Sequence, residues 1–166
     1  PRVVIDAVLA RDMQGIVQRV GPDEYMFAHG LVRQVVIEGI TLQARKEIHS
    51  AICEAIVGLY PNRLDEMSER LSRHYFESGQ YDEAADALVR VARKLEGESA
   101  IDEAIAALQR AADVLSMVSE PDRERVFRIY EDIAVLCFRN RDLELGADLM
   151  LKAMQLAESQ EAAPYV

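Results

Sequence analysis

A stripe of small and apolar residues occurs three times in this chain and limits the folds that it can adopt. The three segments begin at Tyr81, Ile101 and Leu143, and the stripe falls at offsets 0, 3, 4, 7, 10, 11 and 14 in each. The first stripe consists of Tyr81, Ala84, Ala85, Leu88, Val91, Ala92 and Leu95, the second of Ile101, Ala104, Ile105, Leu108, Ala111, Ala112 and Leu115, and the third of Leu143, Gly146, Ala147, Met150, Ala153, Met154 and Ala157. Because an α-helix has about 3.6 residues per turn, these offsets predict three amphipathic helices with a shared packing face.

Two intervening segments, 64–75 and 126–137, keep most of the same stripe, so five helices are predicted between residues 61 and 166. A small residue stands at offset 3 in each of the three repeated stripes, at Ala84, Ala104 and Gly146. Small residues let helices approach closely. An ordinary helical bundle shares the amphipathicity but does not require a small residue at the same place three times. We therefore predict a short α-solenoid of stacked helical hairpins over residues 61–166.

Residues with a local preference for helix ends mark the predicted boundaries. Gly79, Gly97 and Asn140 suit the C-terminal ends of helices because they tolerate the left-handed conformation. Ser99 and Ser119 are each followed three positions later by Asp, which resembles a capping box. The connections between these helices are short, so neighbouring helices are predicted to run antiparallel.

The repeated segments resemble the second helix of a tetratricopeptide repeat. The matching residues are Gly79, Tyr81, Ala84 and Leu88 in the first segment, Ala104, Leu108 and Ala111 in the second, and Gly146, Met150 and Ala153 in the third. The spacing departs from that family, whose period is about 34 residues. Ala84 and Ala104 lie closer together in the sequence than this period, and Ala104 and Gly146 lie further apart. The resemblance therefore implies degenerate repeats and leaves their pairing open.

The N-terminal part, residues 1–60, has a different sequence pattern. Residues 3–10 suit a helix, 15–20 alternate like a strand, 21–24 form a turn signal and 25–27 suit a returning strand. Two helical stripes follow, which gives the order expected at the end of a winged-helix domain. This part holds six basic and seven acidic side chains, so nearly all of the net charge of −10 lies on residues 61–166. We predict two domains, 1–60 and 61–166, in a mainly α protein with one small β-hairpin.

The N-terminal part also resembles a specific family. The run Tyr25-x-Phe27-x-His29-x-Leu31-Val32-Arg33, followed by Arg45-Lys46-x-x-His49, is similar to the winged-helix end of bacterial signal-transducing ATPases with numerous domains. In that family the segment follows a P-loop ATPase module and precedes tetratricopeptide-like repeats. The proteins include multidomain adenylate or guanylate cyclases and ATP-dependent transcriptional regulators. The resemblance implies that His29 senses the β-phosphate of ADP in a parent protein. The alternative is a histidine that caps its own helix or packs under the wing.

The residues point away from catalysis in this chain itself. The sequence has no GxxxxGK[ST] motif, no HExxH and no CxxC, so we expect no ATPase site, no metal site and no cofactor here, while ATP or ADP belongs to the parent protein that the resemblance implies. Cys53 and Cys137 lie among apolar residues and are expected to be buried thiols. No apolar run approaches about 18 residues, so we expect a soluble, cytoplasmic protein.

The leading hypothesis is a noncatalytic regulatory segment that binds a protein partner on its helical repeats and couples this binding to an upstream nucleotide-binding module. The alternatives are a free-standing peptide-binding repeat scaffold and a winged-helix DNA-binding regulator. The acidic charge disfavours nucleic acid, and the helix beginning at His29 offers only Arg33 as a cation. Apolar surface left on residues 1–60 predicts a homodimer, and no membrane contact is expected.

Overall fold

The structure is a computed structural model of the 166-residue chain, and it describes residues 15–21, 25–120 and 122–161, with side chains as far as Gln155. The chain divides into two compact units between Ala44 and Arg45. The predicted boundary lay at residues 60 and 61. The difference arises because most of the helix Leu42–Leu59 belongs to the second unit, where Cys53 and Ile56 share a buried cluster with Leu71 and Ala87. The predicted helix over residues 3–10 lies outside the described residues.

The first unit contains the predicted β-hairpin. Strand β1 (Val17–Arg19) pairs antiparallel with β2 (Tyr25–Phe27), and Gln18 lies opposite Met26. Helix α2 (Gly30–Gly39) follows the second strand, as the sequence predicts for the start of a helical stripe near His29. None of the residues described in this unit is buried.

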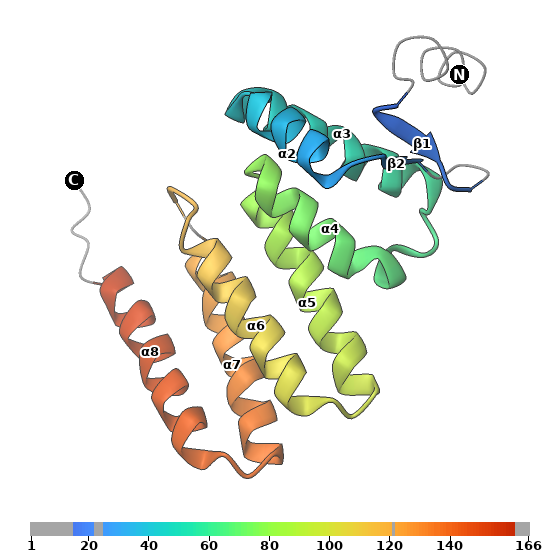
Figure 1. The fold of residues 1–166 in the computed structure, drawn as a ribbon. Helices are drawn as coiled ribbons and strands as arrows, with labels where there is room; N and C mark the ends of the chain where they lie inside the picture. Colours follow the sequence, from blue (N-terminus) through green and yellow to red (C-terminus); the bar gives the residue numbers. More distant parts are fainter. Residues whose placement is uncertain (1–14, 22–24, 121, 162–166) are drawn as a thin grey trace. The chain divides into compact units, whose positions relative to one another are not determined.

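The second unit is a row of helices in which neighbours along the chain pack against each other (Figure 1). After α3 (Leu42–Leu59) come α4 (Leu64–Ser78), α5 (Tyr81–Gly97), α6 (Ile101–Leu115), α7 (Arg123–Arg139) and α8 (Leu143–Glu161). The helices α4 to α8 fall where five helices were predicted. The described chain is thus mainly helical, with a small hairpin before the packed helices, and the predicted fold class is confirmed.

The small residues of the repeated stripe lie where helices touch. Ala84 and Ala104 are fully buried. At Gly146, an added Cβ would lie 3.2 Å from the Cβ of Cys137 on α7, which is closer than neighbouring atoms normally approach. The main core joins α5, α6, α7 and α8 and is rich in alanine. Small side chains at these positions therefore allow close contact between helices, as the stripe predicts.

The turns before α5, α6 and α8 share one backbone geometry. Each has a residue with positive φ two positions before the helix: Gly79 at 83°, Ser99 at 62° and Arg141 at 61°. In each turn the N–H of the next residue donates to the carbonyl five positions back, as from Gln80 to Tyr75. This shared turn explains why the three stripes align when they are started at Tyr81, Ile101 and Leu143.

Four of the predicted caps differ in the structure. Gly97 is the last residue of α5 and does not take the left-handed conformation predicted for it. Ser99 ends the turn after α5 in the left-handed conformation and caps nothing, because the N-cap of α6 is Ala100 without a side-chain bond. The N-cap of α7 is Asp122, which accepts from the N–H of Arg125, so Ser119 is not the cap. Asn140 follows α7 but has φ −83°, and its neighbour Arg141 takes the left-handed conformation instead.

The second unit contains a repeat of two helices. Helix α5 begins at Tyr81 and α7 at Arg123, while α6 begins at Ile101 and α8 at Leu143. Both pairs are separated by the same distance in sequence, which we call the repeat offset and which also separates Ala104 from Gly146. The left-handed residues Ser99 and Arg141 have this offset, and so do the hydrogen bonds around them. The pairing that the sequence left open is therefore α5 with α6 and α7 with α8.

The third stripe is only partly correct. Gly146 and Ala153 are buried as predicted and Met150 is half-buried, but Leu143, Ala147 and Met154 are exposed. Leu149, which the stripe did not include, is buried instead. The buried face of α8 therefore includes only part of the predicted stripe. The reason is that, within the described chain, α8 has a neighbouring helix on one side only.

Candidate binding groove between α5 and α7

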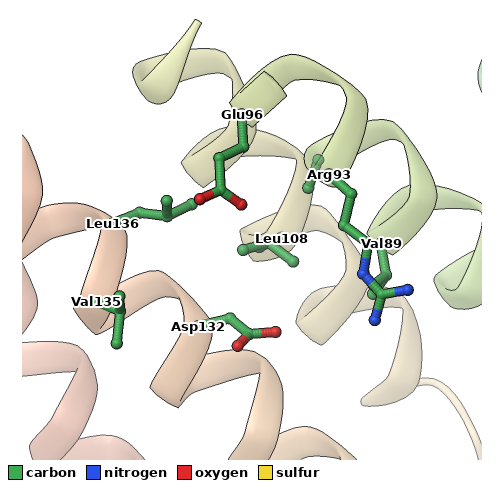
Figure 2. A pocket seen from close by; sticks show the side chains of 8 residues that line it. Val89, Arg93, Glu96, Leu108, Asp132, Val135 and Leu136 are labelled. Atoms are coloured by element: carbon green, nitrogen blue, oxygen red, sulfur yellow. The ribbon is translucent and has the colours of Figure 1, made fainter. Parts of the chain in front are cut away.

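The second unit contains a hollow of about 240 Å³ between α5 and α7 (Figure 2). Its lining residues come from three helices and are Val89, Ala92, Arg93, Glu96, Leu108, Asp132, Val135 and Leu136. Leu108 of α6 is almost fully buried and forms part of an apolar floor with Ala92 and Leu136. The hollow therefore combines an apolar base with charged groups on the flanking helices.

Ion pairs join α5 to α7 at one end of this groove. The guanidinium of Arg125 lies 2.9 Å from a carboxylate oxygen of Asp82 and 2.7 Å from one of Asp86. It also donates to the main-chain carbonyl of Asp82 at 2.8 Å. The Arg125 side chain is only 25% exposed, so this fork is shielded more than a typical surface pair.

A second ion pair joins the same helices near their other ends, where Arg139 donates to Glu96. The spacing from Asp82 to Glu96 on α5 equals the spacing from Arg125 to Arg139 on α7. This spacing corresponds to about four helical turns, so each pair of side chains lies on one face of its helix. The two ion-pair sites hold α5 and α7 parallel and in register on either side of the hollow.

The polar lining of the hollow carries more negative than positive charge. Arg93 stands on the α5 side, and Asp132 stands on the α7 side (Figure 2). Glu96 also lines the hollow and is already bonded to Arg139. Val135 adds a large apolar side chain that is 58% exposed. On the α7 side, Asp132 and Val135 thus suit a ligand with an apolar group next to a positive charge.

The repeat-packing residues identified in the sequence serve the core and not this groove, with one exception. Leu108 lines the hollow, whereas Ala84, Leu88 and Ala111 lie in the main core. Gly79 ends α4 in the left-handed conformation, and Tyr81 packs against the core from its edge. Sequence reasoning missed the charged residues at the groove. The equal spacing of acids on α5 and of arginines on α7 is the signal that points to them.

Two histidines from neighbouring helices meet in the second unit. The Nδ1 atoms of His49 on α3 and His74 on α4 lie 3.0 Å apart, so one ring donates and the other accepts. Burial lowers the pKa of His74; the charges of His49, Arg70 and Arg73 lower this pKa further, and Glu77 opposes them. The hydrogen bond requires at least one neutral ring and links α3 to α4. Tyr75, the residue next to His74, packs against both buried clusters.

His29 occupies the N-cap position of α2 in the first unit. Its backbone is extended, its side chain is exposed, and it makes no side-chain cap hydrogen bond. His29 is thus the N-cap residue, with its carbonyl accepting from the N–H of Arg33, but its side chain makes no cap. The predicted contact with a nucleotide phosphate stays a prediction.

Both cysteines are buried free thiols, as the sequence predicts. Burial, with help from Glu83 and Glu54, raises the pKa of Cys53 to about 11. Burial also raises the pKa of Cys137, with Asp142 adding to the effect. Neither thiol is therefore ready to act as a nucleophile at neutral pH. Among the described residues, no group of three or more His, Cys, Asp or Glu side chains is placed to hold a metal ion.

No protein-family model, no curated protein and no solved structure matches the chain. The resemblances to tetratricopeptide repeats and to signal-transducing ATPases thus depend on the residues quoted for them. In the described part of the chain, no helix is both long enough and apolar enough to cross a bilayer.

Proposed function

We propose that the chain is a noncatalytic protein-interaction segment whose α5–α7 groove binds a short segment of a partner protein. The observation that carries this proposal is the hollow between two parallel helices that ion pairs hold in register. At about 240 Å³ it lies below the usual size of a small-molecule pocket, which begins near roughly 300 Å³. A protein side chain or two fits this volume better than a cofactor does.

The lining also favours one class of partner segment. Leu108, Val89 and Val135 offer apolar contact, and Asp132 offers a carboxylate beside them. The chain as a whole has a net charge of −10, which favours the approach of basic partners. The proposed ligand is therefore an apolar residue flanked by Lys or Arg.

The experiment is selection of random peptides displayed on phage against the purified chain, followed by fluorescence anisotropy with the selected peptides. We expect sequences with a large apolar residue beside Lys or Arg. Asp132→Lys and Val135→Glu should each weaken binding at least tenfold. Leu59→Glu is the matched control because Leu59 is an exposed apolar residue of the same unit outside the groove. Selected peptides that bind all four proteins equally would refute the groove as the site.

The wider proposal is that this segment couples partner binding to an upstream nucleotide-binding module. It is supported by the family resemblance of the segment around His29 and by the order of hairpin, helix and repeats along the chain. The mechanism is a population shift, in which a partner on the repeats changes how the first unit docks on that module. Sequencing the parent gene upstream of Pro1 tests it: a P-loop motif is expected, and its absence would contradict the coupling.

A further inference from the structure

Most charged groups along the α5–α7 groove are used within the fold. At one end Arg125 bonds two aspartates of α5, and near the other end Arg139 bonds Glu96. Two charged side chains that line the hollow remain, and these are Arg93 of α5 and Asp132 of α7. Within the described part of the chain, neither of them takes part in an ion pair or a side-chain hydrogen bond. Both are therefore available to a ligand.

Arg93 and Asp132 stand on opposite walls of the hollow. Figure 2 shows them on facing helices, with Leu108 of α6 in the middle. Both charged residues are exposed, whereas Leu108 is almost fully buried. The charges thus lie at the rim of the hollow and the apolar surface lies at its base. When only the charged groups without a partner in the described chain are considered, the α5 wall is positive and the α7 wall is negative.

A ligand that covers the apolar floor also removes water from the two charges at the rim. A charged group that is covered without gaining a partner loses the free energy of its hydration. A segment with only basic side chains would satisfy Asp132 but would bring positive charge close to Arg93, which is unfavourable. A segment with one basic and one acidic side chain satisfies both walls at once.

On the basis of the proposed function, we infer that the partner segment also carries an acidic side chain, Asp or Glu, and that Arg93 binds it. Neighbouring side chains of an extended segment point to opposite faces. When an apolar residue points to the floor, the residues before and after it therefore point toward the rim, where the charged groups stand. The recognised motif is an apolar residue with a basic residue on one side and an acidic residue on the other.

Arg93 then determines specificity in a way that the net charge of the chain does not. The charge of −10 attracts any basic segment and mainly raises the rate of association. It does not distinguish a purely basic segment from one that also carries an acid. The guanidinium of Arg93 does so, because it donates hydrogen bonds to a carboxylate and repels a cation at contact distance.

The test uses the peptides selected by phage display against the full chain, synthesised with an amidated C-terminus so that every carboxylate is a side chain. We expect Asp or Glu on one side of the apolar residue and Lys or Arg on the other. In fluorescence anisotropy, Arg93→Glu should weaken binding about tenfold and Arg93→Gln about threefold. A peptide in which the acid is replaced by Lys should bind the Arg93→Glu chain more tightly than the unaltered chain.

Lys94→Glu is the matched control, because Lys94 is the next residue on α5, its side chain is 53% exposed and it does not line the hollow. It makes the same change in net charge and should alter binding by less than about twofold. Peptides that depend on Asp132 and Val135 but bind the Arg93→Glu and Lys94→Glu chains equally would overturn this inference and leave the groove as the site. Peptides that also ignore Asp132→Lys and Val135→Glu would refute the groove itself.

Discussion

The two units of this chain contrast in how their apolar residues are used. In the second unit α5, α6 and α7 bury alanines, leucines and isoleucines in one continuous core. In the first unit the described residues include Leu31 at 76% and Val35 at 63% exposure, and none is buried. A two-stranded hairpin with one short helix has little stability of its own. The helices of the second unit therefore bury their apolar side chains against one another, whereas the described residues of the first unit leave theirs exposed.

The largest effect should come from a cavity in the core of the second unit. Ile133 is fully buried, and Ile133→Ala should lower the free energy of unfolding by about 2–5 kcal/mol. The matching change in the first unit, Val35→Ala, should stay within about 0.5 kcal/mol. Urea denaturation followed by circular dichroism measures both. If both changes lowered the free energy of unfolding by similar amounts, the two units would not differ in how they use apolar residues.

The left-handed turns should give the next largest effect. Gly79→Ala places a Cβ at φ 83° and should cost about 1 kcal/mol. Ser99→Gly and Arg141→Gly remove the same strain from equivalent turns and should each stabilise the chain by up to about 1 kcal/mol. Thermal unfolding of the three variants checks the signs. A stabilising Gly79→Ala would contradict the shared turn geometry.

The ion pairs across the groove should contribute less. Arg125→Ala removes contacts to two aspartates and a carbonyl and should cost about 1 kcal/mol, because the guanidinium is partly shielded. Arg128→Ala is the control, since its pair with Glu124 is exposed and local to α7. It should cost roughly 0.5 kcal/mol or less. Equal losses in urea denaturation would show that the pairs do not hold α5 and α7 together.

The smallest effect concerns pH and the link between α3 and α4. Folding lowers the pKa of His74 below the value of about 6.5 that a histidine has in an unfolded chain. When the pH falls below about 6.5, the unfolded chain therefore binds more protons than the folded chain does. The contribution of neutral His74 to the free energy of unfolding should therefore be fully present near pH 7 and be lost as the pH drops below about 6.5. His74→Gln should flatten this part of the profile of melting temperature against pH. An unchanged slope in the variant would exclude His74 as its source.

The helices and the hairpin could be predicted because their signals are local. The stripe offsets depend on helical periodicity alone, and the small residues Ala84, Ala104 and Gly146 act on the adjacent helix. The left-handed turn residues could not be predicted in this way. Ser99 and Arg141 take the left-handed conformation only because neighbouring hydrogen bonds impose it. Nothing in the local sequence distinguishes them from ordinary helix flanks.

The groove could not be predicted for a different reason. Arg125 meets Asp82 and Asp86 only because α6 returns the chain so that α7 lies parallel to α5. The repeat offset was visible between Ala104 and Gly146, but the resemblance to a family with a shorter period obscured the pairing. The exposed part of the stripe on α8 likewise depends on which helix is next to it and not on its own sequence.

The most direct test of the central claim is an NMR titration of the isotope-labelled chain with a peptide selected for binding. The account predicts that the amide shifts that move first and furthest belong to α5 and α7 around Val89, Arg93, Asp132 and Val135. It also predicts that Asp132→Lys abolishes these changes and Leu59→Glu does not. Shift changes confined to α2 and the hairpin, with the α5–α7 groove unaffected at saturation, would contradict it.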